Sequence, residues 1–162
     1  SELNLPRPRV GLVWAGNPNH SNDRQRSLPL AQLLAALPSG FSYISLQREL
    51  RPGDSRLLQA HPEIHCLGDQ LADFADSAAL CRELDLVICV DTSVAHLCGA
   101  LGVPVWIVLP FAADWRWLRR REDSPWYDSA RLFRQPQPGD WAGALASIAQ
   151  QLTDILGRSN RQ

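Results

Sequence analysis

The 162-residue chain contains no lysine and no methionine, so all sixteen of its cationic side chains are arginines. This bias is more typical of genomic codon usage than of a chemical requirement. The missing initiator methionine and the proline-rich segment Pro6-Arg7-Pro8 indicate a piece of a longer protein. We expect residues 1–9 to be a linker, residues 10–156 to form one domain and residues 157–162 to be a tail.

A strong net charge and a long apolar run are absent as well. The formal net charge of -1 argues against a nucleic acid or a membrane surface as the main partner. The run Arg119–Arg121 has acidic neighbours in Asp114, Glu122 and Asp123, so we interpret it as a solvated or interface loop. The chain shows neither a signal peptide nor an apolar run of membrane-spanning length, which predicts a cytoplasmic protein without a membrane span.

Metal-binding patterns are missing too. The four cysteines are Cys66, Cys81, Cys89 and Cys98. They lack C-x-x-C spacing and three of them fall in apolar runs, which favours buried free thiols over disulfides or a metal site. His61 and His65 are four residues apart, but Pro62 breaks the helix that would align them. We therefore expect no metal and no cofactor.

The sequence lacks the usual signatures of two enzyme classes. The first strand–helix turn lacks G-x-G-x-x-G and offers only Gly11 and Gly16, which argues against a dinucleotide-binding oxidoreductase. The G-x-S-x-G elbow of a hydrolase is also absent. Asp91, Ser93 and His96 could be read as a triad, but they follow one another along a single helix start, whereas the base of a triad approaches from another segment.

What the sequence does contain is an alternation of buried strands and amphipathic helices. The clearest unit is a β-branched strand, Leu86–Val90, followed by a helix that should end near Leu101 and a second strand, Val105–Leu109. The other expected strands cover residues 10–14, 41–47, 64–67 and 130–134, and the other expected helices cover residues 28–37, 54–60, 73–84 and 141–156. Right-handed crossovers then predict an α/β fold, a doubly wound Rossmann-like parallel sheet of about six strands.

The start of the helix after Val90 is the predicted binding site. Ligands of open α/β sheets bind beyond the carboxyl ends of the strands, and an uncapped helix N-terminus suits an anion such as phosphate. Asp91 or Thr92 is expected to N-cap this helix. The side expected to pack on the sheet carries Val94, Leu97, Cys98 and Leu101. The opposite side, expected to face a ligand, carries Thr92, Ala95, His96 and Gly99.

Simpler interpretations of these residues stay open at this point. Asp91 serves equally well as a helix cap, and His96 as a surface histidine in a first turn. Arg24 and Arg26 are by default solvated loop charges, although they follow the first strand and so lie on the side of the proposed anion site.

Residues 90–97 and 99–106 resemble the nucleotide-sugar signature of glycosyltransferase family 9, the heptosyltransferase family. Residues 10–18, 73–76 and 123–127 resemble its other blocks. The likeness is strongest to the carboxyl-terminal domain of bacterial tetratricopeptide-repeat proteins that end in a heptosyltransferase-like domain. The resemblance implies the donor-binding half of a two-domain, GT-B glycosyltransferase that needs no metal and transfers a sugar to a glycan or protein.

Residue roles follow from the same resemblance. It implies that the diphosphate and sugar of the donor contact Asp91, Thr92, Ser93 and His96, with Arg26 in place of a family lysine. Asn17 and Arg24, which follow the first strand, are further candidate donor contacts, and Gly16, Gln47, Asp73, Pro110 and Trp115 are candidate cleft-lining residues. The catalytic base would belong to missing N-terminal acceptor or repeat domains, leaving this domain inactive alone. The alternatives are a non-catalytic nucleotide-sugar-binding or scaffold module and a purely structural domain.

Overall fold

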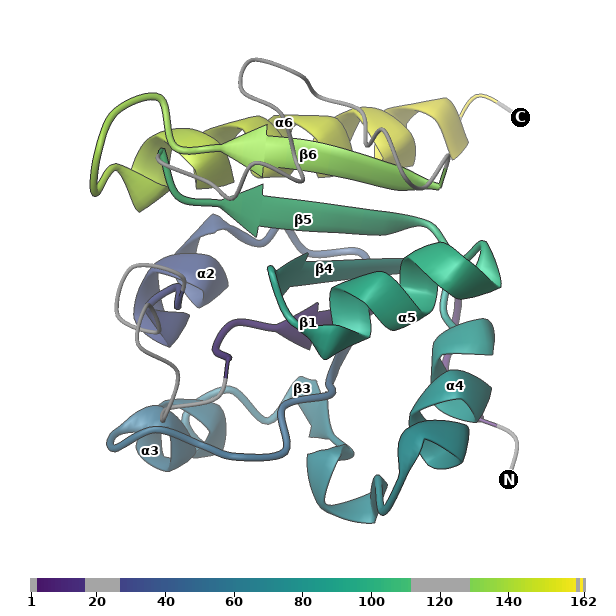
Figure 1. The fold of residues 1–162 in the computed structure, drawn as a ribbon. Coiled ribbons are helices and arrows are strands. Elements are labelled where there is room, and N and C mark those ends of the chain that lie inside the picture. The colour runs from purple at the N-terminus through teal and green to yellow at the C-terminus, as the bar shows by residue number, and fades with distance from the viewer. Residues whose placement is uncertain (1–2, 17–26, 112–128, 160, 162) are drawn as a thin grey trace.

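A computed structural model describes residues 3–16, 27–111, 129–159 and 161. Its strands are β1 (Arg9–Val13), β2 (Ser42–Ser45), β3 (Ile64–Cys66), β4 (Leu86–Val90), β5 (Val105–Leu109) and β6 (Ala130–Arg134). Its helices are α2 (Leu30–Ala36), α3 (Asp54–Gln59), the 3₁₀ helix η1 (Gly68–Gln70), α4 (Phe74–Arg82), α5 (Ser93–Leu101) and α6 (Trp141–Ser159). The strands form one parallel sheet in the order β3-β2-β1-β4-β5-β6 (Figure 1), which confirms the predicted Rossmann-like α/β arrangement.

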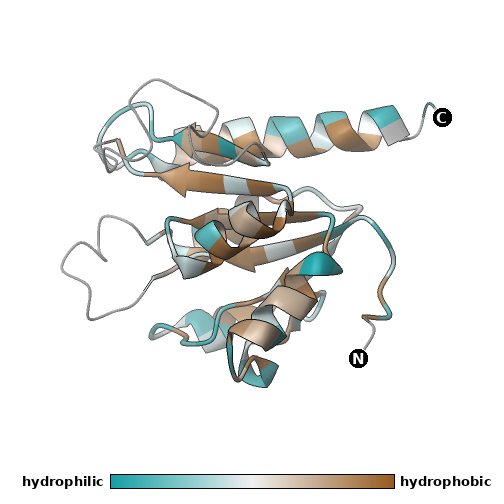
Figure 2. Ribbon diagram, turned by 45° about the vertical axis from the view of Figure 1, so that its right-hand side comes forward, coloured by the Kyte–Doolittle hydropathy of each residue, from teal (hydrophilic) through white to brown (hydrophobic). Residues whose placement is uncertain are grey.

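Each face of the sheet has its own apolar core. On one face α2 and α6 contact each other and bury Leu33 and Ile148. On the other face α4 and α5 lie together and bury Cys81 and Cys98. Figure 2 shows that the strands are apolar along most of their length, whereas α6 carries both polar and apolar residues along its length. Burial on both faces is what gives parallel strands continuous apolar runs.

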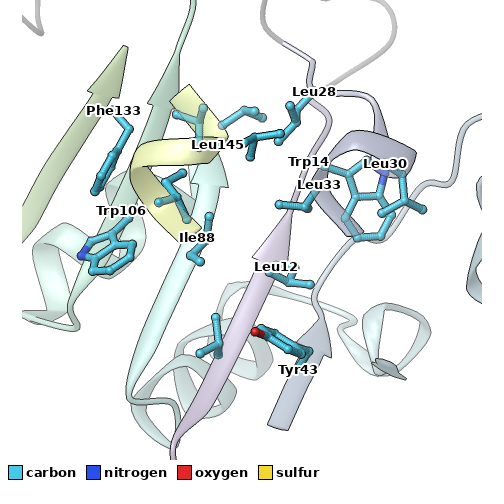
Figure 3. Close-up of a cluster of buried hydrophobic side chains, with 14 of the residues drawn as sticks. Leu12, Trp14, Leu28, Leu30, Leu33, Tyr43, Ile88, Trp106, Phe133 and Leu145 are labelled. Carbon is cyan, nitrogen blue, oxygen red and sulfur yellow. The ribbon is translucent and has the colours of Figure 1, made fainter. Parts of the chain in front are cut away.

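The core beneath α2 and α6 is built around large side chains from neighbouring strands. Figure 3 shows Leu12 and Ile88 on the two central strands, with Trp106 beside Phe133 further along the sheet. The ring centroids of Trp106 and Phe133 are 5.1 Å apart. Burying an aromatic ring or a branched aliphatic side chain contributes about 1.5–3 kcal/mol. This core holds the strands in register and so fixes where their carboxyl ends lie.

Several boundaries differ from prediction by one or two residues, and hydrogen bonds explain the differences. β1 ends at Val13 rather than at residue 14 because the Trp14 N–H donates to the side chain of Gln47. α2 begins at Leu30 rather than at residue 28 because the Leu28 N–H donates to the Trp14 carbonyl and Pro29 holds the N-cap position. The boundaries of β4, β5 and β6 are as predicted.

The packing side of α5 matches the prediction at Val94, Cys98 and Leu101, but it includes Ala95 and not Leu97. Ala95 and Cys98 are fully buried, with Val94 and Leu101 partly buried beside them, whereas Leu97 stays partly exposed. Ala95 therefore faces the sheet and not a ligand. The prediction chose the largest apolar residues, but the small side chains at 95 and 98 let the helix approach the sheet closely, and this contact sets its rotation.

The cysteines are all free, but one of them is not buried as expected. Cys66 lies on β3 at the edge of the sheet, where its side chain is exposed. Cys81, Cys89 and Cys98 are buried together under α4 and α5. Burial raises the pKa of the Cys89 thiol, and a hydrogen bond with Cys81, together with burial, raises the pKa of the Cys98 thiol, which keeps both groups neutral.

Candidate functional site

A cavity of about 580 Å³ opens at the carboxyl edge of the sheet, between the ends of β1, β2 and β4. Four segments form its wall: residues 13–16 after β1, residues 46–49 after β2, the region of Leu71 and Ser77, and residues 91–94 at the start of α5. Its volume lies in the range of about 300–1,000 Å³ that is usual for small-molecule pockets. The structure thus places five predicted residues on one cavity wall. They are Gly16, Gln47, Asp91, Thr92 and Ser93.

The start of α5 presents polar groups to this cavity. Thr92 holds the N-cap position, but its side chain makes no capping hydrogen bond. Its Oγ1 atom is buried and has no hydrogen-bond partner among the described residues. The N–H groups of Ser93 and Val94 precede the first hydrogen bonds of the helix, which Ala95 and His96 donate to the Thr92 carbonyl. By contrast, the Asp73 carboxylate caps α4 by accepting from the Asp76 N–H.

Asp91 and His96 form a pair at the same helix start. Asp91 Oδ1 lies 3.3 Å from His96 Nε2. Asp91 is only 5% exposed and borders the cavity, whereas the side chain of His96 is about a third exposed. A buried carboxylate one turn from an imidazole orients the ring, and it also offers an acceptor to hydroxyl groups of a ligand.

Gln47 borders the cavity, yet its amide is used to brace the wall. Its Oε1 accepts from the N–H groups of Trp14 and Ala15, and its Nε2 donates to the carbonyls of Ala15 and Glu49. The one side chain therefore ties the end of β1 to the end of β2. Gly68 packs directly on the Gln47 carbonyl, where an added Cβ would come within 2.0 Å of the oxygen. We interpret Gln47 as a positioning residue for the cavity.

Sequence reasoning missed three polar residues of the wall. Arg48 and Glu49 follow β2 directly and add a cation and a carboxylate, and Ser77 adds a hydroxyl from α4. Spacing contained a usable signal for two of them, because residues just after a parallel strand lie at the ligand-binding edge. The prediction placed these two residues in the connection between the expected strand at 41–47 and the expected helix at 54–60.

The remaining predicted residues are not at the described cavity wall. The Asp73 side chain caps α4. Pro110 follows β5, which is separated from β1 by β4 in the sheet. Neither residue lines the cavity, and His96 does not line it either. Asn17, Arg24, Arg26 and Trp115 lie outside the described residues.

Metal-binding clusters and membrane-spanning helices are two features that the described residues lack. Within residues 3–16, 27–111 and 129–159, no three or more His, Cys, Asp or Glu side chains are grouped in a way that could hold a metal ion. In the same parts of the chain, no helix combines the length and apolar character needed to cross a membrane.

The fold is thus a Rossmann-like α/β arrangement with a cavity at the carboxyl edge of its sheet. In comparisons with known proteins, the chain is 40% identical over 160 residues to Protein FlbA of Caulobacter vibrioides. This match covers 93% of the chain but 26% of that protein, so the chain spans about a quarter of the length of its curated relative. No protein-family model and no solved structure matches.

This relative overturns the resemblance given above. The protein that the chain matches over most of its length is named FlbA and is not a family 9 glycosyltransferase, so the assignment to that family was wrong. The descriptions that depended on this assignment, a glycosyltransferase and a tetratricopeptide-repeat protein, were therefore wrong as well. The signature-like stretch at residues 90–106 has a role in the fold instead, since it forms the end of β4, helix α5 and the start of β5, and its residues 91–94 line the cavity.

Proposed function

We propose that this domain is a binding module for a nucleoside diphosphate or its sugar conjugate, and that the carboxyl-edge cavity holds this ligand. The observation that carries the proposal is the meeting of the 580 Å³ cavity with the uncapped start of α5. The strand order β3-β2-β1-β4-β5-β6, with helices over both faces, supports a doubly wound arrangement. In such sheets, ligands bind at the switch point, which here lies between β1 and β4.

The chemistry of the wall fits the parts of such a ligand. The N–H groups of Ser93 and Val94, the Thr92 hydroxyl and the positive end of α5 suit the diphosphate. Arg48 supplies a cation on the facing wall. Charge-assisted hydrogen bonds of this kind contribute about 1.5–3 kcal/mol each.

The two carboxylates suit a different part of the ligand. Asp91 and Glu49 border the cavity from β4 and β2, and ionised carboxylates accept hydrogen bonds only. They would repel phosphate groups, so we assign them to the hydroxyls of a ribose or a sugar. A nucleotide-sugar has both anionic and hydroxyl-rich parts, which is why we favour it over a simple phosphate.

The first test is calorimetric titration of the domain with ADP, GDP, UDP and CDP and with their common sugar conjugates. At least one nucleotide should bind saturably. We expect Thr92→Val to weaken that nucleotide about tenfold, which corresponds to the loss of one hydrogen bond worth about 1.4 kcal/mol. The melting temperature should not fall, because the buried hydroxyl has no partner among the described residues in the free protein.

The matched control is Thr153→Val on α6. The Thr153 hydroxyl donates to the Ala149 carbonyl on the exposed side of that helix, away from the cavity wall. This variant removes the same atom and should leave nucleotide affinity unchanged. Absence of saturable binding by every nucleotide tested would contradict the proposal and favour a scaffold module.

A further inference from the structure

Phe74, on α4, is the most exposed large apolar side chain among the described residues, and α4 also contributes Ser77 to the cavity wall. Phe74 is 67% exposed, compared with 46% for Phe111 and 43% for Leu50. It is the first residue of α4, a helix whose start is already capped by Asp73. Helix capping therefore does not require an aromatic ring at this position.

The geometry of α4 relates Phe74 to the cavity. Ser77 lies one turn further along the helix and lines the cavity, and Cys81, one turn beyond it, is buried against the sheet. Residues 74, 77 and 81 thus share one side of α4. Leu71, three residues before Phe74, also lines the cavity.

The direction of the helix orients the Phe74 ring toward the edge of the sheet where the cavity lies, although the ring itself is not part of the cavity wall. α4 starts after β3 and η1 and ends just before β4, so it runs from the carboxyl edge of the sheet to the amino edge. Helical side chains lean toward the N-terminus of their helix. Phe74 therefore leans toward the carboxyl edge, where the cavity opens.

Outside α5 the cavity wall combines three branched apolar side chains with the polar side chains of Gln47, Arg48, Glu49 and Ser77. Leu46 follows β2, Leu71 follows η1 and Val13 ends β1, and these three line the cavity on segments other than α5. The polar groups at Thr92 and Ser93 belong to the start of α5. A ligand that satisfies both walls has an anionic end and a flat apolar end.

We propose that Phe74 is a stacking residue for the base of the nucleotide, with Leu46 and Leu71 beneath the same base. This inference rests on the proposed function, because it assigns the second half of the same ligand. Aromatic rings stack on every base, so Phe74 provides affinity for a nucleobase without selecting among bases.

The test compares two probes on the same variants. The first probe is whichever of ADP, GDP and UDP binds the wild-type domain most tightly, and the second is inorganic pyrophosphate, which has no base. Phe74→Ala should weaken the nucleotide about tenfold, the effect expected for losing one stacking contact, and should leave pyrophosphate unchanged. Phe74→Trp should retain nucleotide binding.

Phe111→Ala is the matched control, because it removes another exposed phenyl ring at the carboxyl edge, after β5, a strand that contributes no residue to the cavity wall. It should change neither probe. Equal nucleotide affinities for wild type and Phe74→Ala would overturn the stacking role and leave the proposed function standing. Pyrophosphate binding without nucleotide binding would also overturn it, and binding of neither probe would overturn both proposals.

Discussion

Both ends of the sheet carry acidic side chains next to β4, but the carboxylates at the two ends have different surroundings. At the amino end, before β4, Asp85 accepts from the Arg9 N–H and pairs with Arg7 at 2.6 Å. Glu83 accepts from the Leu3 N–H. At the carboxyl end, after β4, Asp91 borders an open cavity.

The N-terminal segment explains this difference. The guanidinium of Arg9 donates to the carbonyls of Leu3, Leu5 and Glu83, which holds that segment against the amino end. The polar groups there bind the chain itself. At the carboxyl end, residues that follow β1, β2 and β4 border a cavity instead, so acidic side chains at the two ends of one strand have different surroundings.

The largest effect should come from filling the contact between Gly68 and Gln47 at the carboxyl end. In Gly68→Ala the new Cβ would meet the Gln47 carbonyl oxygen at 2.0 Å and its carbon at 2.7 Å, and both are backbone atoms that cannot rotate away. We expect a loss of more than about 3 kcal/mol in the free energy of unfolding, measured by urea titration.

The control for this variant is Gly157→Ala on α6. Its Cβ would meet no heavy atom within 4 Å, so the same substitution should stabilise the helix by up to about 1 kcal/mol. Equal effects at the two glycines would contradict the tight packing assigned to the cavity wall.

The next effect concerns the amide that braces the cavity. Gln47→Leu removes acceptors from the Trp14 and Ala15 N–H groups and should cost about 2–3 kcal/mol, measured by thermal unfolding. It should also weaken nucleotide binding, because the ends of β1 and β2 lose their connection.

Gln135 provides the comparison, since its Oε1 accepts from the Phe111 and Gly139 N–H groups beyond the cavity. Gln135→Leu should lower stability but leave affinity intact; lowered affinity in both variants would show that the brace is not local.

The smallest effect should come from the amino end. Asp85→Asn weakens the hydrogen bond to the Arg9 N–H and the partly exposed pair with Arg7, so we expect a loss of about 1 kcal/mol in unfolding free energy. Nucleotide affinity should not change. A calorimetric titration in which Asp85→Asn lowered affinity as much as Thr92→Val does would erase the distinction between the two ends.

The fold was largely predictable from sequence because its strands are buried on both faces. The run Leu86–Val90 has no alternation that could suggest a surface strand, and Gly102 adopts the left-handed conformation expected at a helix end. The rotation of α5 was not predictable from apolar size, since the close contact at Ala95 decides it.

The cavity was predictable in part for the same reason. Thr92 and Ser93 follow a recognisable strand, so their edge position could be derived from the chain order. Ser77 could not be derived, because its place depends on η1 and on how α4 leans against α5. Asp73 does not line the cavity for an equally local reason, because its carboxylate accepts a hydrogen bond from the Asp76 N–H.

The central claim is that the ligand site lies at the carboxyl end of the sheet and not at the amino end. The most direct measurement is amide ¹H–¹⁵N NMR of the domain during titration with the best-binding nucleoside diphosphate. We expect the largest shift changes at the N–H groups of Ser93 and Val94, with Arg9 and Asp85 unaffected. Saturable binding with the largest changes at Arg9 and Asp85, or no change at any amide, would contradict the account.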